Sequence, residues 1–141
     1  MLLLPVLRAA LDLSAAFVWR AGGLVALTGA AILWLVATRL RPAVFGAANR
    51  ITTVRALGVA LTCAFVGEPV RPDIAWFIIA FAIVLLILDG IDGRLARARS
   101  QASAFGARFD METDAALTLV LALLCWQFGK AGVWILGAGL M

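Results

Sequence analysis

Two uncharged apolar runs, 74–88 and 115–129, enclose the most acidic part of the chain. Four aspartates stand where these runs end and begin: Asp89, Asp92, Asp110 and Asp114. In helices, spacings of three and four residues place each pair on one face. Four carboxylates at the ends of apolar helices repel one another and are costly to bury unpaired. The sequence therefore predicts a divalent cation among them.

The composition predicts an all-α integral membrane protein. Hydrophobic residues make up 65% of the 141 residues, whereas soluble domains are roughly 45–50% apolar. The net charge of +4 comes with arginines beside the apolar runs. This placement favours membrane topology and contact with anionic membrane lipids, so no nucleic-acid partner is expected. Histidine is absent, which excludes acid–base or metal chemistry that depends on it.

The apolar runs predict a polytopic transmembrane helix bundle with about four full spans and a partial last one. The expected spans are 21–38, 51–67, 74–88 and 107–129, followed by the short run 131–141. Residues 1–20 are interrupted by charges, and Arg8 and Asp12 are spaced to pair on one helical face. An interfacial amphipathic helix is the first interpretation of this segment, and a poor extra span is the second. The 74–88 helix is expected to continue through Asp89 and Asp92, and 94–105 to be a polar connection.

Two connections, 39–55 and 89–109, are rich in arginine, whereas the turns at the other end carry few basic residues. The positive-inside rule places both arginine-rich connections in the cytoplasm. Arg55 lies at the edge of a span. It is expected either to extend its side chain to the membrane surface or to face a polar cavity.

The residue types around the aspartates fit phosphate chemistry. Hard cations such as Mg²⁺ take carboxylate oxygens and leave room for substrate phosphate. Two ions can stabilise displacement at phosphorus by neutralising charge on the attacking and leaving oxygens. Glycines at 90, 93 and 106 allow close approach, and the Arg97 guanidinium is suited to a diphosphate. The alternative is that the aspartates are helix caps and the arginines only set topology.

The pattern resembles a family signature at every fixed position. It reads D-x-x-D-G-x-x-A-R-x8-G-x3-D-x3-D and is met by Asp89, Asp92, Gly93, Ala96, Arg97, Gly106, Asp110 and Asp114. This signature is that of the class I CDP-alcohol phosphatidyltransferases. A weaker likeness, N-x-x-T-x-x-R, is met by Asn49, Thr52 and Arg55. On this resemblance, 41–141 is the family core, and 1–40 is an interfacial helix with an added span.

The resemblance implies a membrane phosphotransferase of phospholipid biosynthesis. Such an enzyme moves a phosphatidyl-type group from a CDP-linked lipid donor, such as CDP-diacylglycerol, to an acceptor hydroxyl and releases CMP. Asp89, Asp92 and Asp110, with Asp114 at or near the metals, would hold two Mg²⁺ or Mn²⁺ ions. Asp114 would be the general base. The CDP moiety would be bound by Gly93, Ala96, Arg97, Asn49 and Thr52, with Gly106 a structural glycine beside the site.

The resemblance also implies a homodimer in a bacterial inner or cell membrane, with the active site on the cytoplasmic side and a small or lipid alcohol as acceptor. The family core has about six membrane helices, so this sequence is expected to be C-terminally short. Two alternatives remain at this point. One is a truncated, non-catalytic family member, and the other is a cation or proton transporter that uses the aspartates as an intramembrane relay.

Overall fold

The structure is all-helical in the parts of the chain that it describes. This computed structural model describes residues 3–39, 47–98 and 104–138, and the side chains of 3–38, 49–91 and 105–137. The helices are α1 (Leu3–Ala10), α2 (Ala15–Arg39), α3 (Ala47–Cys63), α4 (Pro72–Ala98), α5 (Ala104–Gln127) and α6 (Trp134–Ala138). The prediction of an all-α helix bundle is thus confirmed for the described residues.

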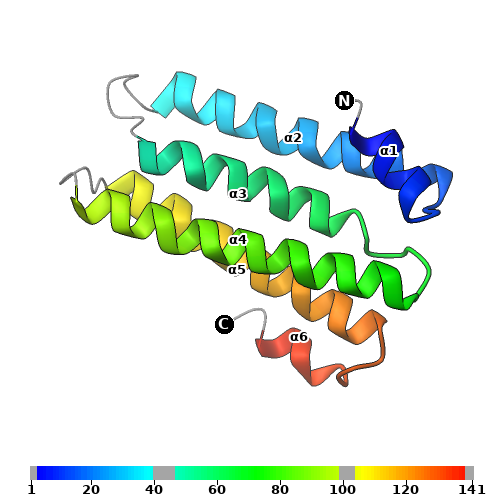
Figure 1. Cartoon of the computed structure of the whole chain (residues 1–141). Coiled ribbons are helices and arrows are strands. Elements are labelled where there is room, and N and C mark those ends of the chain that lie inside the picture. The colour runs from blue at the N-terminus through cyan, green and yellow to red at the C-terminus, as the bar shows by residue number, and fades with distance from the viewer. Residues whose placement is uncertain (1–2, 40–46, 99–103, 139–141) are drawn as a thin grey trace.

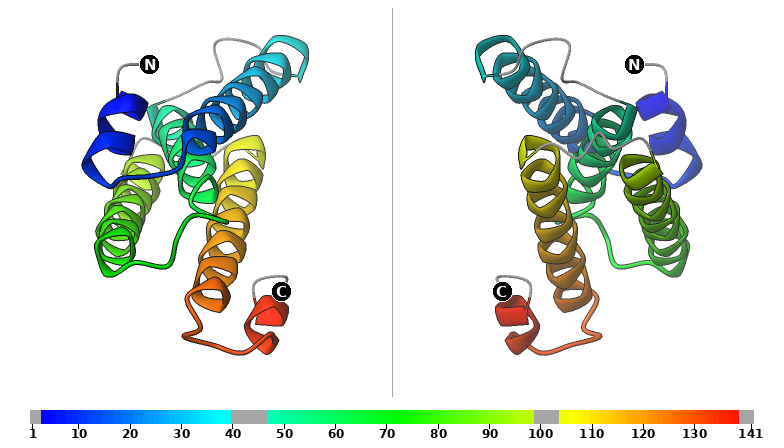
Figure 2. Two further views of the ribbon diagram at one scale, coloured as in Figure 1. Left: turned by 90° about the vertical axis from the view of Figure 1, so that its right-hand side faces the viewer. Right: turned by 90° about the vertical axis from the view of Figure 1, so that its left-hand side faces the viewer.

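Helix α3 is the centre of the bundle. It packs against α2, α4 and α5, while α1 packs on α2 and α6 on α5. Helices α2 to α5 run alternately in opposite directions, and the views along the bundle show α4 and α5 on either side of α3 (Figures 1 and 2). This arrangement places the start of α3, the end of α4 and the start of α5 at one end of the molecule.

Local sequence signals explain where several helices begin and end. The Ser14 hydroxyl accepts a hydrogen bond from the Phe17 backbone N–H at 3.2 Å, which caps the start of α2. Pro72 occupies the first position of α4, where its missing N–H has no helical partner to lose. Gly67 and Gly129 follow the ends of α3 and α5 with φ of 86° and 64°, a conformation that glycine adopts without strain.

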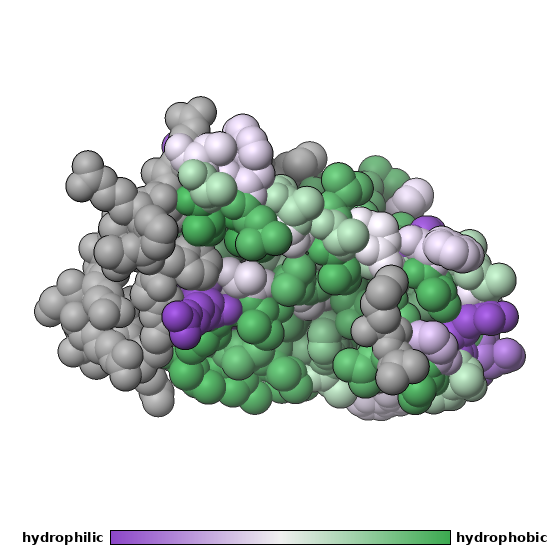
Figure 3. Space-filling view, turned by 90° about the horizontal axis from the view of Figure 1, so that it is seen from above, coloured by the Kyte–Doolittle hydropathy of each residue, from purple (hydrophilic) through white to green (hydrophobic). Residues whose placement is uncertain are grey.

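The bundle has a narrow core and a largely apolar exterior. Buried aromatic and aliphatic side chains from α2, α3, α4 and α5 form one cluster, in which Phe17 and Phe65 have ring centroids 4.9 Å apart. Many large apolar side chains point outward instead. Figure 3 shows such residues over much of one face, with hydrophilic residues toward the ends. An exterior of this kind fits a lipid environment.

Among the described residues, two helices are long and apolar enough to cross a membrane, over Ala15–Thr38 and Pro72–Ile91. Together with the apolar exterior, they support the prediction of a helical membrane protein. Helices α3 and α5, the other two expected spans, are shorter in their uncharged parts. Helix α3 has 17 residues, and the first turns of α5 carry the acidic residues.

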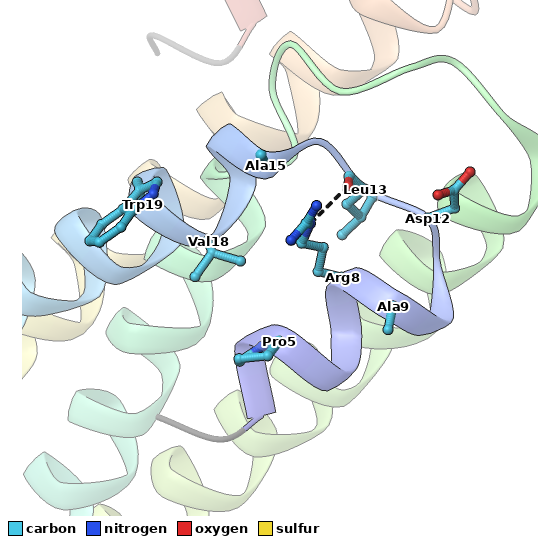
Figure 4. Close-up of a pocket in the computed structure, with 8 residues that line it drawn as sticks. All are labelled: Pro5, Arg8, Ala9, Asp12, Leu13, Ala15, Val18 and Trp19. Atoms are coloured by element: carbon cyan, nitrogen blue, oxygen red, sulfur yellow. Dashed lines mark hydrogen bonds between the residues drawn. The ribbon is translucent and has the colours of Figure 1, made fainter.

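The N-terminal segment folds back at a sharp corner (Figure 4). Asp12 follows α1 with a φ of 45°, so it lies outside the helix and cannot share a helical face with Arg8. The proposed Arg8–Asp12 pairing is therefore wrong. The Arg8 Nε instead donates a hydrogen bond to the Leu13 carbonyl at 3.4 Å, and Asp12 pairs with Arg71 at 3.5 Å. A cavity of about 460 Å³ lies in this corner, between α1 and the start of α2.

Two helix boundaries in the structure also differ from those predicted from the sequence. Helix α3 starts at Ala47 rather than near Ile51, and α4 continues to Ala98 through the first part of the expected polar connection. Residues 94–98 contain alanine, leucine and arginine, which are strong helix formers. Their local preference therefore carries the helix beyond the apolar run.

Candidate metal and phosphotransfer site

Three carboxylates from two helices converge at the end of the bundle where α4 finishes and α5 starts. Asp89 comes from the last turns of α4, and Asp110 and Asp114 from successive turns of α5. Each offers a carboxylate oxygen, and these three oxygens lie within 4.8 Å of one another. The side chains are between 36% and 49% exposed, so the cluster is open on one side. Asp110 and Asp114 lie on one face of α5, as their i,i+4 spacing predicts.

A buried arginine lies against the inner side of this cluster. Arg55, on α3, has only 1% of its surface exposed. Its Nη1 contacts Asp110 Oδ1 at 2.5 Å and Asp89 Oδ1 at 2.9 Å, and its Nη2 donates to Asp114 Oδ1. One guanidinium thus joins α3 to α4 and α5. The question that the sequence left open is answered: Arg55 faces the polar site rather than the membrane surface.

In their ion pairs with Arg55, Asp89, Asp110 and Asp114 each contribute Oδ1. The guanidinium lies on one side of the carboxylates, and their partial exposure leaves the other side accessible to a further cation. This geometry could not be read from the sequence, because it depends on which side of the aspartates α3 packs against.

The negative charge of the three carboxylates favours binding of a cation in addition to Arg55. Two like charges about 4 Å apart repel by roughly 4 kcal/mol at an effective dielectric constant of about 20. Arg55 neutralises one of the three carboxylates, and an excess of two negative charges remains among these four side chains. One divalent ion carries the matching charge. An all-carboxylate donor set is the type that Mg²⁺ and Mn²⁺ prefer, so the residues present fit such an ion.

The two predicted polar residues of α3 lie on the same face as Arg55. Asn49 and Thr52 precede it by six and three residues, and they are 6% and 3% exposed. Spacings of three residues put all three side chains along one helical stripe. Gly106 is half-buried in the first turn of α5, four residues before Asp110. The structure therefore places Asn49, Thr52 and Gly106 at the same end of the bundle as the carboxylates.

The remaining predicted site residues are on the last turns of α4. Asp92, Gly93, Ala96 and Arg97 belong to the helical backbone of α4, but their side chains lie outside the described part of the structure. Their assignment to the metal and CDP sites stays a prediction. Helical continuity from Asp89 does place Asp92 about one turn further on.

Arg55 is the residue that the predicted site lacked. It is the last fixed position of N-x-x-T-x-x-R, but the sequence alone does not assign it to the site. An arginine followed by a long apolar segment is an equally good sign of an interfacial side chain. Its regular spacing from Asn49 and Thr52 was the only signal that favoured the site.

Comparison with known proteins decides the family. The model of the CDP-alcohol phosphatidyltransferase family matches residues 45–141. This chain belongs to the CDP-alcohol phosphatidyltransferase family. The match includes every helix that contributes to the carboxylate cluster. Neither the curated proteins nor the solved structures gave a significant match.

Membership of the CDP-alcohol phosphatidyltransferases has direct consequences. The family consists of transferases of phosphate-containing groups, which use a CDP-alcohol donor and an alcohol acceptor. Its members depend in general on metal ions. The converging aspartates of α4 and α5 lie in the matched part of the chain, and they form a donor set suited to such an ion.

Proposed function

We propose that this protein is a metal-dependent phosphotransferase of phospholipid biosynthesis. It transfers a phosphatidyl-type group from a CDP-alcohol, such as CDP-diacylglycerol, to an acceptor hydroxyl and releases CMP. The observation that carries the proposal is the convergence of Asp89, Asp110 and Asp114 within 4.8 Å, inside the segment matched by the family. Asp89 lies 21 residues before Asp110 and on another helix, yet the three carboxylates meet as a shared phosphotransfer site requires.

Each group of site residues has its own task in this proposal. Asp89, Asp92 and Asp110, with Asp114 beside them, hold two Mg²⁺ or Mn²⁺ ions. When bound, such ions neutralise charge on the donor diphosphate and on the leaving oxygen. The CDP moiety is bound by residues of α3 and α4: Asn49, Thr52, Gly93, Ala96 and Arg97. Gly106 keeps the start of α5 free of side-chain bulk.

The reaction is a substitution at phosphorus. The acceptor oxygen forms a bond to the phosphorus of the phosphatidyl group, and the bond from that phosphorus to the CMP oxygen breaks. CMP leaves with the electron pair of that bond. Asp114 takes the proton of the acceptor hydroxyl, so it is the general base. Its carboxylate is the most exposed of the three, at 49%, and an acceptor that enters from the open side meets it readily.

The lipid environment is part of the proposal. An apolar groove of about 320 Å³ lies between α4 and α5, with Ile79 and Leu86 on one wall and Leu121 on the other. Leu86 stands one turn before Asp89, so the groove leads from the site along the bundle and suits the acyl chains of a lipid donor. We further propose a bacterial inner or cell membrane with the site on the cytoplasmic side, and a homodimer. Residues 1–40 add an interfacial helix and a span to the family core.

The test is metal-dependent release of CMP. The full chain in lipid nanodiscs is supplied with CDP-diacylglycerol, Mg²⁺ and a panel of acceptor alcohols. Asp114→Asn is expected to reduce CMP release by at least 100-fold, in the range typical of lost acid–base catalysis. Asp110→Asn is also expected to reduce CMP release strongly, because it removes a proposed metal ligand. Asp73→Asn is the matched control, because Asp73 is an exposed aspartate at the opposite end of α4. Wild-type turnover in Asp114→Asn would refute the proposed role of Asp114.

The same material separates the enzyme from a cation or proton transporter. A CDP-alcohol phosphotransferase is expected to be stabilised against heat by CDP together with Mg²⁺, because the nucleotide binds the folded state. A transporter that uses the aspartates as a relay has no reason to respond to CDP. A thermal shift with Mg²⁺ alone and none with CDP would therefore favour the transporter.

A further inference from the structure

The buried arginine beneath the carboxylates has a role that the reaction itself does not assign. Arg55 contacts all three acids of the described cluster, and it does so from α3, the helix against which α4 and α5 both pack. Helices α4 and α5 carry the acids but lie on either side of α3 (Figure 2). The Arg55 contacts are therefore a direct polar link between the two acid-bearing helices.

We propose that Arg55 is the built-in counter-cation of the carboxylate cluster. It holds the acids of α4 and α5 together in the metal-free protein, so that the metal site is formed before an ion arrives. It is a positioning residue and does not touch the reacting atoms. The inference rests on the proposed function for the identity of the ion, but the contacts of Arg55 do not depend on the reaction.

The geometry allows Arg55 and a metal ion to bind the same carboxylates from different sides. Arg55 engages Oδ1 of Asp89, Asp110 and Asp114, and it is buried while the acids are partly exposed. An ion can approach from the open side without displacing the guanidinium. Arginine suits this task better than lysine, because its planar group offers several donors in fixed directions and stays protonated. Two of its nitrogens reach three carboxylates here.

A counter-cation can be replaced by another cation, whereas a purely structural side chain cannot. Arg55→Met removes the charge and keeps much of the side-chain length. In excess chelator this variant is expected to unfold about 5 °C or more below the wild type, because three close carboxylates lose their partner. Saturating Mg²⁺ or Mn²⁺ is then expected to raise its unfolding temperature by clearly more than it raises that of the wild type. Tryptophan fluorescence of the full chain in nanodiscs provides the measurement.

Arg20→Met is the matched control. Arg20 is also an arginine paired with a carboxylate, that of the buried Glu68, but it is near the start of α2, at the opposite end of the bundle. Its loss should destabilise the protein to the same extent with chelator and with metal. An equal metal response in Arg55→Met and in the wild type would overturn the inference.

A double variant keeps the test decisive if Arg55→Met does not fold. Adding Asp110→Asn removes one of the repelling charges, so Arg55→Met/Asp110→Asn is expected to fold and to be more stable in chelator than Arg55→Met. If the double variant is no more stable, the counter-cation role is refuted. The comparison of the double variant with Arg55→Met in chelator measures neither metal binding nor turnover. Absence of CMP release would therefore count against the proposed function alone.

Discussion

At the residue scale, a buried carboxylate, that of Glu68, lies at the end of the bundle opposite the site. The Glu68 side chain has no exposed surface and pairs with Arg20. It also accepts hydrogen bonds from the Ser14 backbone N–H at 2.8 Å and from the Ser14 hydroxyl at 2.7 Å. Gln127 donates to the Glu68 carbonyl at 3.0 Å and accepts from the Gly67 N–H at 2.7 Å. This network joins the start of α2, the α3–α4 turn and the end of α5.

Glu68→Gln is expected to lower the free energy of unfolding by roughly 2–4 kcal/mol, because it leaves the Arg20 charge without its buried partner. Chemical or thermal unfolding of the purified full chain measures the change. Glu112→Gln is the control, since Glu112 forms an exposed ion pair with Arg108 at 3.7 Å. Its loss should cost less than about 1 kcal/mol. Equal losses in the two variants would show that burial of Glu68 does not matter.

At the scale of the elements, the close approach of α3 to α4 depends on one glycine. A Cβ placed on Gly58 would lie 2.5 Å from Leu85 Cδ2, and Leu85 is 2% exposed in the core. The end of the leucine side chain must therefore move within packed surroundings. Gly58 lies one turn after Arg55 on α3, and Leu85 lies one turn before Asp89 on α4. The contact thus sets the spacing of the helices that carry an ion pair of the site.

Gly58→Ala is expected to be less stable than Gly29→Ala by about 1–3 kcal/mol, the usual cost of overpacking. Both changes gain the same helix propensity, about 1 kcal/mol. A Cβ at Gly29 meets only Leu57 Cδ2 at 3.9 Å, an ordinary contact. Thermal unfolding of the two variants side by side isolates the packing cost. Equal stability would mean that Leu85 moves aside freely and that the glycine does not fix the helix spacing.

At the scale of the whole molecule, tryptophans and charges mark the two ends of the bundle. Four of the five tryptophans are exposed near the ends of helices away from the carboxylate cluster: Trp19, Trp76, Trp126 and Trp134. Tryptophan is enriched where membrane meets water, so these residues indicate one interface. The carboxylates, Arg50 and Arg108 are at the other end. This polarity supports the proposed orientation, with the site on the cytoplasmic side.

The orientation can be tested with two introduced cysteines in a chain whose Cys63 and Cys125 are replaced by alanine. Ala107→Cys lies on the exposed side of α5 beside the site, and Val70→Cys lies in the exposed α3–α4 turn. An impermeant maleimide is expected to label Val70→Cys in intact cells and Ala107→Cys only in inside-out vesicles. The reverse pattern would place the carboxylates outside the cytoplasm.

The sequence alone determined the helical class, the polar character of the site and three of its acids. These features follow from local patterns: uncharged runs of membrane length, and aspartates spaced by three and four residues. The family signature added the chemistry. Each of these patterns lies within one segment of the sequence, so it can be recognised without knowing how the helices pack.

Only the tertiary structure decided which side of the aspartates is neutralised. Arg55 is 34 residues before Asp89 and 55 before Asp110, and no local spacing connects them. Packing of α3 between α4 and α5 brings its guanidinium beneath the carboxylates, whereas the sequence allowed a position at the membrane surface equally well. The pairing of Arg20 with Glu68 was hidden for the same reason. Ion pairs between helices depend on how the helices pack, and that is settled by burial of the whole core.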